Sequence, residues 1–167
     1  MKRYIKSSDD SELQYAFAPE YEKREYVAHW STDPVILETM AYDPDERIRA
    51  FVAENLNTPP AILAMLAQDE ANMVHGLVAI NPNTPPDSLR ILAKSSAFFI
   101  RGCVAANPST PDDLLEELVH DGTAWVREHA AKNPNITVDM LILLANDKDY
   151  WTSCSAKSAL DRRGIEL

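Results

Sequence analysis

A segment that recurs at a fixed interval constrains the fold of this chain more than any other feature of the sequence. The segment Val104–Asp121 reads VAANPSTPDDLLEELVHD, and its central Asn-x-x-Thr element recurs at steps of 26 residues. The asparagines of these elements are Asn55, Asn81, Asn107 and, in an altered copy, Asn133. A regular period of this length indicates a repeat architecture, in which stacked units bury a continuous core that one unit could not form alone.

The pattern inside each unit predicts two short helices, which we call helix A and helix B. Helix A carries apolar residues three and four positions apart, such as Ile100, Cys103 and Val104, which line one helix face. The Asn-Pro step ends this helix, because asparagine accepts turn conformations and the residue before proline avoids helical ones. Helix B follows with pairs of leucines, such as Leu114 and Leu115.

The starts of both helices have predicted capping residues. The residues that open helix A are expected to be N-caps, and so are the threonines before helix B, with the following proline at the first helical position. The expected N-caps of helix A are Asp43, Asp69, Ser95, Asp121 and Asp147; those of helix B are Thr58, Thr84 and Thr110, followed by Pro59, Pro85 and Pro111.

The register divides the chain into three parts. Residues 1–17 lack the repeat and are expected to form an N-terminal cap. Residues 18–146 hold five repeats of about 26 residues, and in the first of them we place Trp30 at the position of the turn asparagine. Residues 147–167 hold a partial repeat and a C-terminal cap, with Gly164 expected to stop the last helix.

Several repeat families have units of similar length, and the local spacing discriminates among them. A leucine-rich repeat would place a strand at helix A, but the apolar residues there have helical spacing and do not alternate. Tetratricopeptide and HEAT units, at roughly 34 and 40 or more residues, are too long.

The signature resembles the leucine-rich repeat variant family. The resemblance rests on Asp121–Pro134, which reads D-x3-W-V-R-x2-A-A-x-N-P, and on the Asn-Pro-x-Thr-Pro of Val104–Asp121. It implies a single all-α domain, a right-handed solenoid of alternating α-helices and short α- or 3₁₀-helices, and it implies no activity. The family's archetype carries a cysteine-rich iron–sulfur segment before its repeats; here no cysteine precedes Cys103, so that function is not implied.

Composition argues against two classes of partner. The formal net charge is −10, and no lysine or arginine occurs between Arg49 and Arg90. Nucleic-acid binding through phosphates needs clustered cations, so we expect no nucleic-acid partner. Apolar runs are far shorter than a membrane span and the N-terminus has no signal-peptide pattern, so we expect a cytoplasmic protein without a membrane partner.

Cysteines and histidines give no pattern of a metal or cofactor site. Cys103 and Cys154 lie nearly two periods apart, too far for a disulfide between stacked repeats. No histidine pair has the spacing of metal ligands, and no glycine-rich loop is present to bind phosphate. We therefore expect no cofactor, no metal and no catalytic residues.

Three groups of side chains are candidates for function. The arginines Arg49, Arg101 and Arg127 share one position of helix A, with Arg24 and His75 in the same register, and are expected to bond aspartates across the repeat joints rather than to bind an anion. Met73, Phe99, Trp125 and Trp151 share another position, beside Phe98 and Tyr150. Most of these are expected in the core, and Trp125, Tyr150 and Trp151 are the ones expected to be partly exposed. The third group is the acidic cluster Asp112, Asp113, Glu116 and Glu117, either a solvated face or a surface for a basic partner.

The favoured hypothesis is a non-enzymatic protein-binding or scaffold module, with a homodimer through an apolar end as a further possibility. A second hypothesis is an immunity or antitoxin protein that binds a basic toxin through its acidic face. A third is a DNA-modifying enzyme by analogy with HEAT-like glycosylases, for which Trp125, Asp121 and Arg127 supply the residue types, although the acidic surface argues against it.

Overall fold

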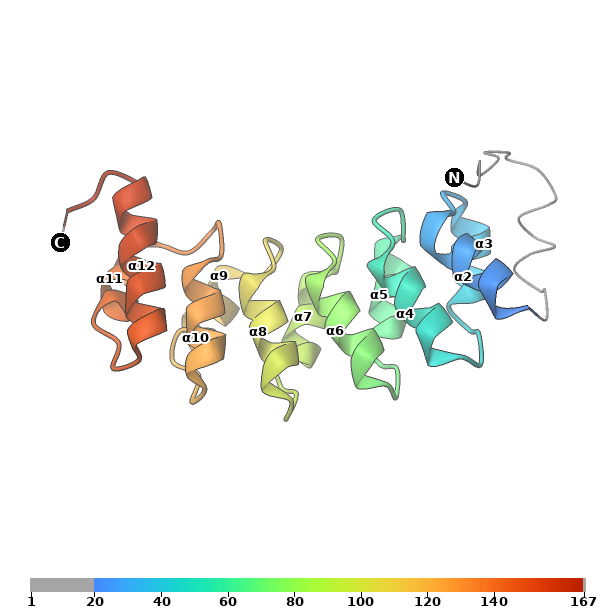
Figure 1. The fold of residues 1–167 in the computed structure, drawn as a ribbon, viewed down its shortest axis with the longest axis horizontal. Helices are drawn as coiled ribbons and strands as arrows, with labels where there is room; N and C mark the ends of the chain where they lie inside the picture. Colours follow the sequence, from blue (N-terminus) through green and yellow to red (C-terminus); the bar gives the residue numbers. More distant parts are fainter. Residues whose placement is uncertain (1–19, 167) are drawn as a thin grey trace.

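The computed structural model describes residues 20–166, and this part of the chain forms eleven α-helices in an elongated array (Figure 1). The predicted N-terminal cap, residues 1–17, lies outside the described residues. The A helices are α2 (Tyr21–Trp30), α4 (Glu46–Glu54), α6 (Asn72–Ile80), α8 (Phe98–Ala106), α10 (Ala124–Ala131) and α12 (Tyr150–Arg162). The B helices are α3 (Pro34–Met40), α5 (Pro60–Leu66), α7 (Pro86–Leu92), α9 (Asp112–Leu118) and α11 (Val138–Ala145).

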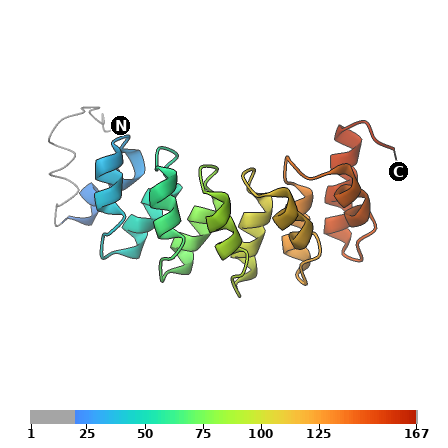
Figure 2. The same ribbon diagram turned by 180° about the vertical axis from the view of Figure 1, so that it is seen from behind.

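The helices form two layers. Each A helix packs along the next A helix, from α2 through to α12, whereas successive B helices touch one another much less. Figure 1 shows the layer of A helices in front, and Figure 2 shows the B helices from the opposite side. The described chain is therefore an all-helical repeat solenoid, as the 26-residue period predicts.

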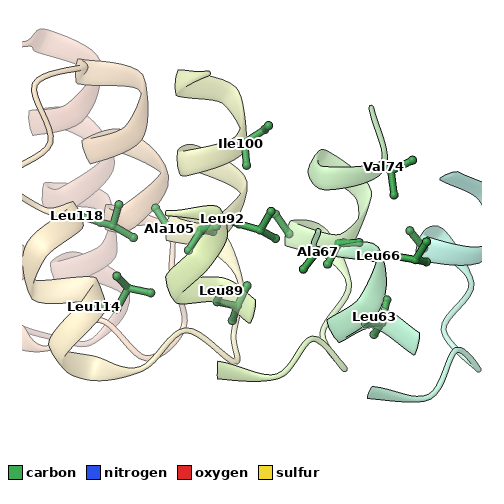
Figure 3. Close-up of a cluster of buried hydrophobic side chains, with 14 of the residues drawn as sticks. Leu63, Leu66, Ala67, Val74, Leu89, Leu92, Ile100, Ala105, Leu114 and Leu118 are labelled. Atoms are coloured by element: carbon green, nitrogen blue, oxygen red, sulfur yellow. The ribbon is translucent and has the colours of Figure 1, made fainter. Parts of the chain in front are cut away.

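The core lies between the two layers and runs the length of the array, and Figure 3 shows the part of it that includes Leu63, Leu89 and Leu118. Helix A contributes Ile100 and Val104, and helix B contributes Leu89 and Leu115, all of them fully buried. Because each unit supplies the same core positions, the apolar contacts continue from one repeat to the next.

The predicted N-caps of both helices are wrong, although the residues are structurally important. The N-cap of α6 is Ala71, and Asp69 instead accepts a hydrogen bond at 2.9 Å from the Ala71 backbone N–H, in a turn that precedes the helix. The N-cap of α5 is Pro59, with Pro60 at its first position, while the Thr58 hydroxyl donates at 2.6 Å to the Val52 carbonyl at the end of helix A. The same shift applies to Asp43, Ser95, Asp121 and Asp147, and to Thr84 and Thr110 with Pro85 and Pro111.

The B helices are α-helical, and they tighten only at their ends. In α5 the Ala67 N–H donates to the Leu63 carbonyl four residues back, whereas Gln68 and Asp69 donate to carbonyls three residues back. The resemblance allowed a 3₁₀-helix in each unit. In the described part, 3₁₀-type bonds occur at the helix ends, where they satisfy carbonyls that lack an α-helical partner.

The first turn differs from the prediction. Helix α2 has ten residues and continues through Trp30, so Ser31 becomes its C-cap and lies where the other repeats place asparagine. Trp30 is exposed. The turn after α2 is correspondingly short. Asp33, two residues after the C-cap, is already the N-cap of α3 and accepts a hydrogen bond from the Val35 N–H.

Helix α12 ends the array with altered joint residues. Ala159 replaces the turn asparagine, so α12 continues to Arg162, and Gly164, with a φ of 70°, stops it as predicted. Ser153 occupies the register position of the arginines, and Lys157 the position at which each earlier A helix from α4 to α10 buries an alanine. Those buried alanines are Ala53, Ala79, Ala105 and Ala131.

Candidate interaction surface

Four buried asparagines join each repeat to the one before it, and we call them the asparagine ladder. They are Asn55, Asn81, Asn107 and Asn133. The Asn107 amide donates at 2.7 Å to the Ala79 carbonyl and at 2.9 Å to the Asn81 carbonyl, and its Oδ1 accepts from the Ser109 N–H. These carbonyls lie at the end of the preceding helix A, where the helix itself supplies no donor. The ladder therefore caps one helix with a side chain from the next repeat.

A second ladder joins the repeats through charges. Arg127 Nε and Nη2 donate to both carboxylate oxygens of Asp147, at 2.6 and 2.9 Å, and Nη1 donates to the Asp121 carbonyl. Arg49 bonds Asp69 in the same bidentate way, Arg101 bonds Asp121, and Arg24 contacts Asp43 at 2.9 Å. This arginine–aspartate ladder confirms the prediction that these arginines bond aspartates across the joints.

The ladder also sets the protonation of its aspartates. Hydrogen bonds from Arg127 hold the pKa of Asp147 below its ordinary value, against the effect of burial. Burial raises the pKa of Asp69, but the hydrogen bonds from Arg49 and from the backbone outweigh it, so this pKa is also lowered. These perturbed carboxyl groups all hold repeats together, which explains their shifts without any catalytic role.

One joint has no such ion pair. In the repeat that contains α6 the register position of the arginine is His75, and the aspartate position after it is Ser95. His75 Nε2 is buried without a hydrogen-bond partner in the described chain. The joint between α6 and α8 therefore depends on the asparagine ladder and on apolar packing.

The aromatic row is mostly exposed, which corrects the expectation that most of it belongs to the core. Met73, Phe98 and Phe99 are 47%, 49% and 40% exposed, and Tyr150 and Trp151 are 70% and 67% exposed. Trp125 is partly exposed, as expected, and its buried part packs against the core.

The small residues of the preceding A helix explain which rings are covered. The Trp125 ring lies on Gly102, where an added Cβ would overlap it, and Phe98 contacts it edge-on with ring centroids 5.7 Å apart. The His129 ring also contacts the Trp125 ring, with centroids 3.7 Å apart and the two planes tilted by 34°. The position that would receive Trp151 is occupied by Glu128 instead of a glycine, so that indole stays in solvent.

The acidic cluster lies on the other layer, on α9. Asp112, Glu116 and Glu117 are exposed, and Asp113 bonds Arg90 of α7 at 2.8 Å. A groove of about 350 Å³ between these helices is lined by charged side chains of both signs. One carboxylate of the cluster is therefore already neutralised by the neighbouring repeat.

The trio considered for DNA chemistry is engaged in packing. Asp121 accepts two hydrogen bonds from Arg101, Arg127 is bound to Asp147, and Trp125 lies on Gly102. None of the three presents a free functional group at an open site.

Within residues 20–166, no three His, Cys, Asp or Glu side chains gather as metal ligands, and no helix has the length and hydropathy to cross a bilayer. Cys103 and Cys154 are both free thiols, and burial raises the pKa of the Cys103 thiol.

The two layers and the two ladders define a helical-repeat solenoid. The leucine-rich repeat variant family matches residues 46–71, which are α4, α5 and the turn that follows. A solved structure described as "a leucine-rich repeat variant with a novel repetitive protein structural motif" is similar, with a TM-score of 0.68 and 28% identity over 90% of this chain. These matches confirm the resemblance: the repeats are of the leucine-rich repeat variant type.

The extent of the likeness is limited. The chain spans about 60% of the length of the solved structure that it matches. No curated protein matches the chain.

Proposed function

We propose that this protein is a non-enzymatic binding module that recognises another protein through the exposed surface of its A-helix layer. The observation that carries the proposal is the set of large apolar side chains that stand in solvent there. They are Met73, Ile80, Phe98, Phe99, Tyr150 and Trp151, each at least 40% exposed. Large apolar patches on soluble proteins mark interaction sites more often than isolated exposed residues do.

The position of these side chains supports binding rather than stability. Met73 and Ile80 lie seven residues apart in α6, on the face opposite the buried Val74 and Val78. Apolar surface that stays exposed to water does not stabilise the fold, but its burial by a partner makes the free energy of binding more favourable. The packed A helices also favour binding, because a surface that is already ordered loses little entropy when a partner binds.

The ladders support the same proposal. The arginines and the buried carboxylates that would otherwise suggest catalysis bond to one another across the joints, as Arg127 and Asp147 do. The charged network thus fixes the spacing of the A helices and leaves the exposed apolar side chains as the variable part of each repeat.

Site-specific photo-crosslinking in cells tests the proposal. A photoreactive phenylalanine analogue at Phe98 or Tyr150 is expected to crosslink another protein, and the same analogue at Tyr42, which is equally exposed at the end of α3, is the matched control. The expected result is a discrete crosslinked partner from the A layer that is absent or much weaker for Tyr42. Failure to capture any protein from the A layer would count against a binding module of this kind.

A further inference from the structure

The exposed apolar side chains of the A layer are concentrated over one joint. Helix α6 presents Met73, Leu77 and Ile80 at positions i, i+4 and i+7, and helix α8 presents Phe98 and Phe99 beside them. Leu77 is only partly exposed, and the other four are exposed. We call these five residues the central apolar patch. Phe99 lies over the same α6–α8 joint that lacks an ion pair, and Phe98 extends the patch toward Trp125 of α10.

Glutamates on helix α4 and in the loop before α6 lie along the edge of the patch. Helix α4 places Glu46 and Glu54 at the register positions that Asn72 and Ile80 occupy in α6, and Glu70 precedes α6 in the loop. Glu46 and Glu70 form no ion pair within residues 20–166, and the contact of Glu54 with the His29 ring is long, at 3.6 Å.

The cations nearby are already neutralised. Arg47, at the register position of Met73, bonds both oxygens of Asp45 and lies over the Tyr21 ring. On the other flank, Lys132 of the α10 C-terminus bonds Glu128 at 2.7 Å. The charge that remains around the patch is negative, in agreement with the absence of lysine and arginine between Arg49 and Arg90.

We propose that the central apolar patch binds a polypeptide segment of a partner protein that presents large apolar side chains flanked by lysine or arginine. This inference rests on the proposed function and specifies the chemistry of its partner. Apolar anchors would cover Met73, Ile80 and Phe99, and the flanking cations would face Glu54 and Glu70. A lysine or arginine can also lie over an exposed ring such as Phe98, where the aromatic face attracts a cation.

The size of the patch suits a short segment. Two A helices stacked about 8–10 Å apart, each of nine residues and therefore about 13 Å long, offer room for two or three turns of helix. Hydrophobic anchors would supply most of the affinity, and the acidic rim would supply specificity and rate of association.

Charge also argues against the other occupants. A second copy of the chain would bring the same glutamate rim, Glu54 and Glu70, against itself, and like charges across an interface are unfavourable. An anionic membrane or a nucleic acid would meet the same repulsion. A basic polypeptide segment is the occupant whose charge complements the rim.

Peptide display on the full chain, followed by affinity measurement, tests the inference. Random 16-residue peptides selected on the protein are expected to combine two or more large apolar residues with an excess of lysine and arginine. The selected peptides are then measured against Met73→Ser/Ile80→Ser and against Glu54→Lys/Glu70→Lys. Matched controls on the B layer are Val35→Ser/Ile91→Ser and Glu116→Lys/Glu117→Lys, which change equally exposed residues.

We expect the serine pair in the patch to weaken binding about tenfold or more, since each lost anchor reduces the affinity severalfold. The charge reversal is expected to weaken it about three- to tenfold at low salt and less at high salt. Both control pairs are expected to stay within about twofold of the unchanged protein, as residues outside an interface do. Circular dichroism of every variant checks that the fold is retained.

The outcomes separate this inference from the proposed function. Selected peptides that are acidic or uncharged, or binding that is lost only in the B-layer variants, would overturn the inference and leave a protein-binding module in place. Peptides that bind no surface of the folded chain would overturn both. Patch-dependent dimerisation by sedimentation, or patch-dependent binding to vesicles of phosphatidylcholine and phosphatidylglycerol, would assign the patch to another occupant and refute the proposal.

Discussion

Two glycines in the same register are expected to respond in opposite ways to the same substitution. Gly76 and Gly102 lie inside α6 and α8, and each receives the ring of the next helix, Phe99 and Trp125 respectively. Replacing a glycine by alanine inside a helix stabilises it by about 1 kcal/mol, because alanine loses less backbone entropy. The net change in stability depends on whether the added methyl group overlaps the neighbouring aromatic ring.

The gain survives in Gly76→Ala. Its Cβ would lie 3.6 Å from Phe99 Cε2, an ordinary van der Waals contact, so the expected change is a stabilisation of about 1 kcal/mol. In Gly102→Ala the Cβ would overlap the indole of Trp125, and the ring must move. Overpacking of this kind costs about 1–3 kcal/mol, so the expected net effect is a destabilisation of up to about 2 kcal/mol.

Urea unfolding monitored by circular dichroism measures both variants, and the two midpoints are expected to shift in opposite directions. A double-mutant cycle identifies the cause, because Gly102→Ala should lose its penalty in a Trp125→Leu background, where the smaller side chain leaves space. Equal stabilisation by both alanines would show that Trp125 does not pack on Gly102, and would refute the account of which rings are covered.

Three further predictions concern the joints. Asn107→Ala removes two buried hydrogen bonds and one partly buried one, and it is expected to destabilise the protein by about 3 kcal/mol at about 1 kcal/mol each. A loss below about 1 kcal/mol in urea unfolding would contradict the role of the ladder. His75→Arg combined with Ser95→Asp introduces the missing ion pair and is expected to raise the free energy of unfolding by about 1–2 kcal/mol. Neither single change is expected to raise it. A thermal melt in which the double variant is no more stable than the unchanged protein would argue against the repeat geometry. The pKa of Asp147 is lowered by Arg127. The ion pair therefore contributes to the free energy of unfolding above the unfolded pKa of about 4, and this contribution is lost as the pH falls through the lower folded pKa. Asp147→Asn is expected to reduce the loss of stability on acidification, and an unchanged dependence of stability on acidic pH would contradict this assignment.

The repeat period predicted the architecture because it is a property of the whole chain, whereas local rules misassigned several residues. Thr58 before Pro59 resembles an N-cap, and only the structure shows that its hydroxyl satisfies the Val52 carbonyl of the preceding helix. Asn107 was assigned to its own turn, because capping rules consider neighbours within a few positions. Its donors reach carbonyls 26 and 28 residues back, a distance that those rules do not search.

The candidate surface was predicted only in part. Tyr150 and Trp151 are exposed and Trp125 is partly exposed, as expected, but the sequence predicts a core position for Phe99, which is 40% exposed. Part of the pattern could be predicted by comparing each ring position with the small position of the preceding A helix. Glycine at position 102 predicts a partly covered ring at 125, and glutamate at 128 predicts an uncovered one at 151, but glycine at 76 would predict a covered Phe99, which is 40% exposed. Such pairs depend on how helices stack, which periodicity within one helix does not reveal.

The altered residues of α12 have a consequence for assembly. A solenoid resembles a linear polymer, since the surface that ends one unit is the surface that receives the next, and such head-to-tail contacts can propagate into filaments. At this end the buried alanine methyl is replaced by the ammonium of Lys157, and the arginine that bonds the aspartate of the following repeat is replaced by Ser153. A further unit added here would have to bury a charge and would lack the ion pair that joins most of the earlier repeats. Lys157 and Ser153 therefore disfavour the docking of a further repeat unit, from this chain or from a second copy, against α12.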